Sequence, residues 1–334
     1  MENPRIVFPA AGQVELEDAP MSALRPGEVR IRTACTMISV GTELSVLAGD
    51  FPPDSQWAAN FSFPHHPGYN NIGAVIELGP DVASEWLGRK VGTWGEHARY
   101  VVQQAAKLYP ACEELADEQA VFFTIPQIVM NAVRRSRLTW GESVVVYGAG
   151  LLGQFAARLA RLCGATQVCV VDVSDFRLQR LPDDAGVTAI HAERDRPADV
   201  VRRLTAGRMA DVVFEVTGAA DLIPREFEVL REQGRMVMLS SPRGRTAFDF
   251  HDLCNRFSYT IIGAHNFSHP PTATLDNPWT MARHVELFFN YLRSGEIDVT
   301  PLISHRASFE QAPAMYRQML ADRSQTLGVV IHWN

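Results

Sequence analysis

The chain has 334 residues, of which 46% are hydrophobic and 21% are charged, and it carries a net charge of −7 at pH 7. This composition is typical of a globular protein with two domains or one large one, and its acidic balance disfavours a nucleic-acid partner. No apolar run approaches the ~18–20 residues that cross a bilayer, no apolar signal-peptide core is present, and the five scattered cysteines predict reduced thiols, so we expect a cytoplasmic protein without a membrane partner.

The first ~117 residues are predicted to be rich in β-strands. Short alternating or apolar runs, separated by glycine and proline, are the signal for this. The expected strands lie at 28–39, 71–79, 88–94 and 97–103.

The pattern changes near residue 118, where 117–136 has helical spacing. Apolar strands then alternate with helices, which predicts a parallel sheet with both faces covered. The expected strands are 143–148, 167–172, 211–218, 235–241 and 259–265, and the expected helices include 151–163 and 176–181. A helix at 281–292 and a strand at 327–333 follow.

A glycine-rich turn follows the first of these strands. Gly148, Gly150 and Gly153 form the pattern GxGxxG between a strand and a helix. The three glycines suit a tight turn, close approach to a pyrophosphate, and close packing of helix on strand, respectively. The first helical residues, Leu151 and Leu152, offer free N–H groups to an anion. The sequence therefore predicts a dinucleotide site.

An acidic residue follows at the spacing that the motif requires, because Asp172 ends the next strand 19 residues after Gly153. A carboxylate there accepts both ribose hydroxyls and repels a 2′-phosphate, which favours NAD(H) over NADP(H). Arg177 could flank the ribose or adenine. Further cofactor-binding candidates at later strand ends are Thr217, Ser240, Ser241 and Gly263. A domain that binds another nucleotide, or none, is the alternative.

With this turn in mid-chain, the whole sequence resembles the medium-chain dehydrogenase/reductase superfamily, which contains zinc alcohol dehydrogenases and zinc-free quinone reductases. The segments PGEVRIRTACTMISVGTEL and HPGYNNIGAVIELG carry the resemblance, with a similar closing segment from residue 302. They are most similar to the bacteriochlorophyllide dehydrogenase-like branch. The resemblance implies an α/β fold: a doubly wound Rossmann domain at 123–266 inserted in a GroES-like, β-rich catalytic domain at 1–122 and 267–334. It also implies a homodimer.

The superfamily's catalytic zinc ligands would fall at Val40, Tyr69 and Phe123, with Asn70 at the position of a neighbouring glutamate. None of these side chains is a zinc ligand of the usual kind. The run of four cysteines that holds a structural zinc is also missing. We therefore predict no zinc. Adjacent histidines on a strand point to opposite faces, so His65 and His66 are expected in an aromatic surface loop.

Without zinc, side chains must supply hydrogen bonds and acid/base chemistry. Tyr69 occupies the place of a ligand, Thr42 that of the family's proton-relay hydroxyl, and His265 follows a strand that approaches the nicotinamide in the family. Each has a structural alternative: a filler of the zinc void, a turn cap and an ordinary loop histidine. The expected lining of the substrate pocket is Asn70, Ser45, Val40 and Phe123. Glu43 is expected to hold the local turn.

These features favour a zinc-independent, NAD(H)-dependent oxidoreductase acting on a secondary alcohol or ketone, such as a cyclic polyol, sugar derivative or hydroxyalkyl group of a larger metabolite. Two alternatives stay open: an NADPH-dependent quinone or enone reductase, and a non-catalytic nucleotide-binding protein. The loop 50–67, with four large aromatics and four prolines, is expected to be either a lid over a bulky substrate or an oligomer contact.

Overall fold

The computed structural model describes residues 2–334. The chain divides into two compact units. The first contains the chain up to Thr124 together with Val285–Asn334, and the second is Ile125–His284. Two helices run across these boundaries, α4 (Thr124–Ser136) and α9 (Met281–Ser294).

The first unit is built on a seven-stranded mixed sheet. Its strand order is β14-β15-β3-β4-β5-β7, and β6 pairs with β3. The strands are β3 (Glu28–Ile38), β4 (Asn71–Leu78), β5 (Lys90–Thr93), β6 (Tyr100–Gln104), β7 (Tyr109–Pro110), β14 (Ile303–Ser308) and β15 (Gly328–His332). A separate hairpin joins β1 (Pro4–Val7) to β2 (Glu15–Asp18). Strands from both ends of the chain thus share one sheet, because β15 pairs antiparallel with β3.

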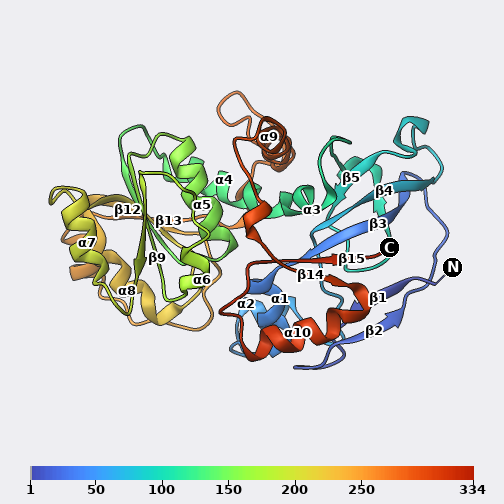
Figure 1. The fold of residues 1–334 in the computed structure, drawn as a ribbon, viewed down its shortest axis with the longest axis horizontal. Helices are drawn as coiled ribbons and strands as arrows, with labels where there is room; N and C mark the ends of the chain where they lie inside the picture. The colour runs from blue at the N-terminus through green and yellow to red at the C-terminus, as the bar shows by residue number, and fades with distance from the viewer. Residues whose placement is uncertain (1) are drawn as a thin grey trace. The chain divides into compact units, whose positions relative to one another are not determined.

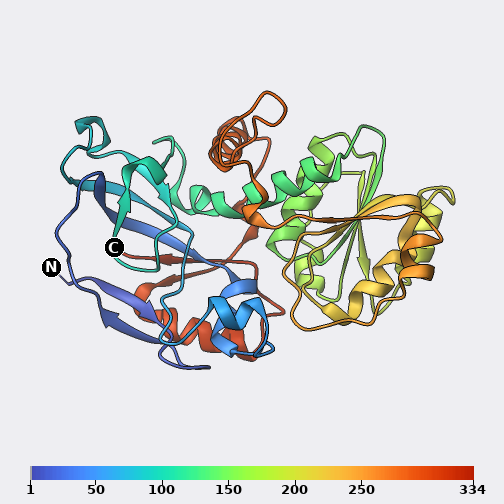
Figure 2. The same ribbon diagram turned by 180° about the vertical axis from the view of Figure 1, so that it is seen from behind.

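Two helices of this unit, α1 (Val40–Ala48) and α10 (Ala312–Ala321), contact each other (Figures 1 and 2). Both contribute to an apolar cluster that includes Leu44, Tyr316 and Trp333. The remaining short helices are α2 (Gln56–Asn60) and α3 (Asp117–Ala120). This packing places the start of α1, which directly follows β3, next to residues from the far end of the chain.

The second unit contains a six-stranded parallel sheet with the order β10-β9-β8-β11-β12-β13. The strands are β8 (Ser143–Tyr147), β9 (Gln167–Asp172), β10 (Val187–His191), β11 (Ala210–Glu215), β12 (Leu230–Met238) and β13 (Thr260–Gly263). The order reverses between β8 and β11. In such doubly wound sheets, ligands bind outside the carboxyl ends of the strands at this point of reversal.

Helices cover both faces of the parallel sheet. In Figure 1, α5 (Leu151–Leu162) and α6 (Asp175–Leu178) lie on one side, and α7 (Pro197–Leu204) and α8 (Ile223–Glu226) lie on the other. The apolar residues of β8, β9 and β11 are almost entirely buried, as expected for strands that are covered on both faces.

The predicted fold class is confirmed: a parallel Rossmann-type sheet lies in the middle of the chain and a β-rich unit is formed by its two ends. Some element bounds differ from the prediction. The helix expected at 176–181 is α6, which starts and ends earlier, and the strand expected from His97 begins at Tyr100.

The segment 267–284 is grouped with the second unit, although we expected it in the first. Hydrogen bonds explain the grouping, because Asn131 Nδ2 donates to Ser268 Oγ (2.8 Å) and Arg134 Nε donates to His284 Nε2 (3.0 Å). No helix within residues 2–334 is both long enough and apolar enough to span a bilayer.

Candidate active site

The glycine-rich turn follows β8 in the second unit. Gly148 has φ +104°, in the region that favours glycine. A Cβ on Gly153 would lie 1.8 Å from the Gly148 carbonyl oxygen, so only glycine fits there. A Cβ on Gly150 would meet no atom within 4 Å. The turn is therefore tightly packed at its two ends and open at Gly150, where the motif requires space for a pyrophosphate.

The open glycine is the N-cap of α5, and Leu151 and Leu152 form the first turn of that helix. Both are partly exposed. N–H groups in the first turn of a helix have no partner within the helix, and they lie at the positive end of its dipole. This turn of α5 is thus suited to bind a phosphate.

Asp172 lies at the carboxyl end of β9 and joins two loops. Its Oδ2 accepts a hydrogen bond from Ala149 N at 2.6 Å. Its Oδ1 accepts from Val173 N (2.8 Å) and Ser174 N (2.9 Å). The carboxylate is therefore fixed beside the glycine-rich turn. Arg177 lies on α6, the short helix that follows β9, and its carbonyl accepts from Gln154 Nε2 at 2.8 Å.

A second carboxylate organises the candidates at the end of β11. Glu215 is fully buried, and its Oε1 accepts from Thr217 N and Oγ1, both at 2.7 Å. The hydroxyl of Ser240 donates to Oε2. Ser241 follows as an exposed residue, and Gly263 ends β13 with open space where a Cβ would project. The predicted cofactor residues thus gather at the carboxyl ends of five strands of one sheet, and Glu215 is the residue that the sequence analysis missed.

His265 also belongs to the second unit. It is exposed, and its Nδ1 accepts a hydrogen bond from Phe267 N at 3.3 Å. An imidazole that accepts at Nδ1 carries its proton on Nε2 when neutral. His265 therefore presents an N–H donor at Nε2.

In the first unit, Tyr69 and Thr42 come together at the N-terminus of α1. The Tyr69 hydroxyl donates to Ser39 Oγ and also has a hydrogen bond with Thr42. The Tyr69 ring stacks on Trp94, with ring centroids 5.6 Å apart. Burial and the negative charge of Glu43 raise the pKa of Tyr69 to about 12, against the lowering effect of the two hydrogen bonds. Tyr69 is thus a protonated donor at neutral pH.

Glu43 lies beneath this cluster. Its Oε1 accepts from Ser39 N at 2.8 Å, and its Oε2 lies 3.0 Å from His97 Nε2 and accepts from the Tyr316 hydroxyl. Burial would raise the pKa of Glu43, but the charge of His97 and the hydrogen bonds outweigh burial and lower it. The expected role of Glu43 in holding the local turn agrees with its bond to Ser39 N.

Three residues that we expected to line the substrate pocket are instead part of the core. Asn70 is fully buried: its amide donates to the Met37 carbonyl (3.0 Å) and accepts from the Thr124 hydroxyl. Ser45 is buried and donates to the Gly41 carbonyl at 2.6 Å. Phe123 is fully buried.

Phe123 packs on other core groups of the first unit. A Cβ on Gly92 would touch its ring, and the rings of Tyr109 and Phe289 lie beside it. Val40, the fourth residue that we expected to line the pocket, remains partly exposed at the first position of α1.

The paired histidines have separate partners. His65 exchanges backbone hydrogen bonds with Phe8 (2.8 and 2.9 Å), and His66 Nε2 lies 2.9 Å from Glu17 Oε1. Three aromatic rings of the loop 50–67 pack against the core of the first unit: Trp57, Phe61 and Phe63. The loop is therefore anchored on its own unit.

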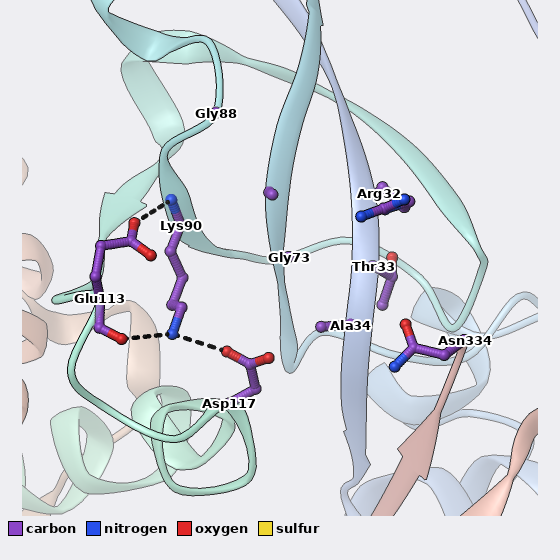
Figure 3. Close-up of a pocket in the computed structure, with 10 residues that line it drawn as sticks. Arg32, Thr33, Ala34, Gly73, Gly88, Lys90, Glu113, Asp117 and Asn334 are labelled. Carbon is purple, nitrogen blue, oxygen red and sulfur yellow. Dashed lines mark hydrogen bonds and ion pairs between the residues drawn. The ribbon is translucent and has the colours of Figure 1, made fainter.

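A hollow of about 250 Å³ lies elsewhere in the first unit, and residues of β3, β4 and β5 line it. Figure 3 draws these lining residues. Lys90 lies on its wall, with Nζ 3.1 Å from the Glu113 carbonyl oxygen and 3.1 Å from Asp117 Oδ1. This ammonium is already neutralised by its neighbours. None of the candidate catalytic residues lines this hollow.

Comparisons with known proteins agree with this geometry. A family model described as zinc-binding dehydrogenase matches residues 152–277. Sorbitol dehydrogenase 1 of Saccharomyces cerevisiae is 23% identical over 367 aligned positions, which cover 98% of each chain. The chain belongs to the medium-chain dehydrogenase/reductase superfamily.

Solved structures share the fold of this medium-chain dehydrogenase/reductase. Galactitol-1-phosphate dehydrogenase of Escherichia coli has a TM-score of 0.82 at 17% identity, covering 98% of this chain and 99% of that one. An alcohol dehydrogenase of Escherichia coli CFT073, solved with NADH, has a TM-score of 0.81 at 16% identity and covers 99% of each chain.

The zinc positions of this medium-chain dehydrogenase/reductase do not fit a zinc ion. A catalytic zinc site needs three nitrogen, sulfur or oxygen ligands and an open position. The corresponding side chains are Val40, Phe123 and Tyr69, two of which have no donor atom. Across residues 2–334, no group of three or more His, Cys, Asp or Glu side chains is arranged to hold a metal ion.

Sequence reasoning missed the residues that surround Glu43 from a distance in the chain. Tyr316 is 273 positions away from Glu43, and His97 is 54 positions away. Neither residue stands in a sequence motif, so neither carried a signal of its own.

Proposed function

We propose that this chain is a zinc-independent, NAD(H)-dependent oxidoreductase that interconverts a secondary alcohol and its ketone. One observation carries the proposal. The phosphate-binding turn is intact and open at Gly150, while the zinc position holds Tyr69, a hydroxyl donor bonded to Ser39 and Thr42. A chain that keeps the nucleotide site and places a proton donor where the metal would act is suited to metal-free carbonyl chemistry.

The second unit would bind the nucleotide. The first turn of α5 would hold the pyrophosphate, and Asp172 would accept the ribose hydroxyls. A negative carboxylate at that position disfavours a 2′-phosphate, which supports NAD(H) over NADP(H). A bound nicotinamide supplies or accepts the hydride. Thr217, Ser240 and Gly263 lie at the same sheet edge and would contact the rest of the cofactor.

Tyr69, whose hydroxyl donates to Ser39 Oγ in this structure, would turn its proton toward the substrate oxygen. When the carbonyl carbon accepts hydride, its oxygen would gain electron density and take the Tyr69 proton, which gives the alcohol. Ser39 and Thr42 would then relay a proton from solvent to the phenolate. Oxidation reverses these steps, with the alcohol proton passing to the phenolate oxygen. His265, with its proton on Nε2, is a second candidate donor.

The substrate class is proposed from the relatives. Sorbitol dehydrogenase 1 and galactitol-1-phosphate dehydrogenase act, as their names state, on a polyol and a polyol phosphate. We infer a small-molecule polyol, sugar derivative or related hydroxyalkyl compound for this chain. The five cysteines are all free, which suits a reducing cytoplasm.

A screen of polyols, secondary alcohols, ketones and enones with NADH absorbance as readout tests the proposal. We expect turnover of a polyol or secondary alcohol with NAD⁺, and tighter binding of NADH than NADPH in a fluorescence titration. Turnover of enones alone would indicate a C=C reductase. Tight nucleotide binding without turnover of any compound would favour a non-catalytic protein.

We also propose a homodimer formed through β13. This strand is at the end of the sheet order, and Ile261 on it is 42% exposed. An apolar edge strand offers unpaired backbone groups to a second copy. Light scattering after size exclusion should give twice the chain mass of 37.1 kDa, and Ile261→Lys should reduce it to one chain mass. A monomeric wild type contradicts the proposal.

A further inference from the structure

Glu43 is one of the most enclosed charged groups of the first unit. It is 3% exposed, and its two carboxylate oxygens accept three hydrogen bonds, from Ser39 N, His97 Nε2 and the Tyr316 hydroxyl. His97 and Tyr316 are themselves fully buried. Burying a carboxylate costs several kcal/mol unless donors compensate it. Three converging donors are therefore a built arrangement for holding a negative charge at this position.

The carboxylate is tied to Tyr69 from two sides. On one side, Ser39 donates its N–H to Glu43 Oε1 and accepts the Tyr69 hydroxyl at Oγ. On the other side, His97 N donates to the Pro67 carbonyl at 2.9 Å, two residues before Tyr69.

Gly68, between Pro67 and Tyr69, has φ +114°, and a Cβ there would lie 2.5 Å from His97 N. The backbone that carries Tyr69 is thus pressed against His97, the residue that bonds Glu43.

We propose that Glu43, held by His97 and Tyr316, is a positioning residue for Tyr69: it fixes Ser39 as the partner of the Tyr69 hydroxyl, and its negative charge disfavours the phenolate. The part of this inference that concerns catalysis rests on the proposed function. The part that concerns Tyr69 itself does not, because it follows from contacts within one unit.

A negative charge near a phenol disfavours the phenolate, so Glu43 makes Tyr69 a hydrogen-bond donor. This is consistent with the raised pKa of Tyr69, for which burial is the largest cause and Glu43 adds to it. Other titratable groups feel the same charge. Burial and Glu43 raise the pKa of Tyr316, and Glu43 partly opposes the lowering of the His65 pKa by burial.

The test is the ionisation of Tyr69, followed by the NMR signal of tyrosine labelled with carbon-13 at Cζ and assigned by its loss in Tyr69→Phe. In the wild type we expect a neutral phenol up to high pH. In Glu43→Gln, which keeps the shape and removes the charge, we expect the midpoint to fall by about one pH unit, or about tenfold more phenolate at a given pH. An unchanged midpoint overturns the proposal.

Glu118→Gln is the matched control. Glu118 is a carboxylate of the same unit that also bonds a histidine, His332, at 2.9 Å, together with Arg306. Its substitution should leave the Tyr69 midpoint unchanged. An equal fall in both variants would mean that any loss of negative charge produces the effect, which also overturns the proposal.

If Glu43→Gln does not fold, Ser39→Ala gives a second test. It removes the acceptor of the Tyr69 hydroxyl but keeps the N–H that bonds Glu43. A phenolate at Tyr69 would accept a hydrogen bond from the Ser39 hydroxyl, which lowers the pKa of Tyr69, so loss of this hydroxyl should raise the midpoint and reduce phenolate at high pH. A midpoint that is unchanged or lower in Ser39→Ala would contradict the proposed role of Ser39 as the partner of the Tyr69 hydroxyl. Because neither measurement needs substrate or cofactor, a failed activity screen and a failed titration are distinguishable.

Discussion

The candidate nucleotide-binding edge of the second unit and the hydroxyl cluster of Ser39, Thr42 and Tyr69 in the first unit are each organised by a buried glutamate. Glu215 accepts hydrogen bonds from Thr217 and Ser240, and Glu43 accepts hydrogen bonds from Ser39, His97 and Tyr316. The difference lies in how far along the chain the partners come from. Those of Glu215 lie within 25 positions, whereas Tyr316 is 273 positions from Glu43. The surroundings of Glu215 are therefore contained in a short segment of the chain. The surroundings of Glu43 form only after both ends of the chain have folded together.

Glu226 is a buried glutamate that lacks the hydrogen-bond donors found around Glu43 in the part of the chain that the structure describes. It is fully buried on α8, and neither carboxyl oxygen has a hydrogen-bond partner among residues 2–334. Burial, with a smaller contribution from Glu215, raises the pKa of Glu226 to about 9. Burial without hydrogen-bond donors thus favours the neutral carboxyl at Glu226, whereas the donors around Glu43 favour its charged form.

The local character of the nucleotide motif is tested by two alanine substitutions. Gly153→Ala would place a Cβ 1.8 Å from a carbonyl oxygen, and we expect at least about 4 kcal/mol of destabilisation with loss of NADH binding. Gly150→Ala has open space and should fold normally yet weaken NADH binding, because its Cβ enters the space assigned to the pyrophosphate. Thermal melts and NADH fluorescence measure both. Undiminished NADH binding by Gly150→Ala contradicts the assignment.

Removing the donor of the hydroxyl cluster should have the next largest effect. Tyr69→Phe deletes one hydroxyl, and a lost general acid typically lowers kcat by about 10²- to 10⁴-fold. NADH affinity should stay within about twofold, because the nucleotide residues belong to the second unit. Steady-state kinetics on the substrate found by screening measures kcat, and a fluorescence titration measures the affinity for NADH. Full activity in Tyr69→Phe would assign Tyr69 a purely structural role.

Because the buried Glu226 carboxyl has no hydrogen-bond partner among residues 2–334, we expect the free energy of unfolding to depend on pH. Glu226 has a pKa of about 9 in the folded state against an ordinary 4.5, so the folded state binds more protons between these values. Wild-type stability should therefore fall as pH rises through this range. Glu226→Gln should stabilise by roughly 4 to 5 kcal/mol near pH 8 and by less than about 1 kcal/mol near pH 5, since each pH unit between the two pKa values contributes about 1.4 kcal/mol.

Thermal melts of Glu226→Gln and wild type at the two pH values check this, with Glu228→Gln, half exposed, as the control. A stabilisation that does not grow with pH would mean that Glu226 is charged in the folded protein.

The smallest expected effect concerns cofactor choice. Asp172→Asn removes the charge but keeps hydrogen-bonding atoms, so NADH binding should weaken by about tenfold, or about 1.4 kcal/mol, while NADPH binding improves. Asp211→Asn is a matched control, since Asp211 near the start of β11 also accepts from a backbone N–H, that of Ser143. Tighter NADPH than NADH binding by the wild type would remove the basis for the role of Asp172.

The sequence predicted the fold class and the nucleotide turn because both depend on short, regular patterns: apolar strands, a GxGxxG turn and an acidic strand end. It placed Tyr69 and Thr42 in one cluster through the family resemblance. It did not predict that Asn70 and Phe123 are buried. Their burial depends on neighbours such as Thr124 and Phe289, which a strand pattern does not reveal.

We propose that this chain oxidises an alcohol without zinc. The most direct measurement is the rate of NADH formation from the screened alcohol before and after exhaustive treatment with a strong zinc chelator, with metal content determined on the same samples. We expect an unchanged rate and well under one zinc per chain. A rate that collapses on chelation and returns on addition of zinc would contradict it.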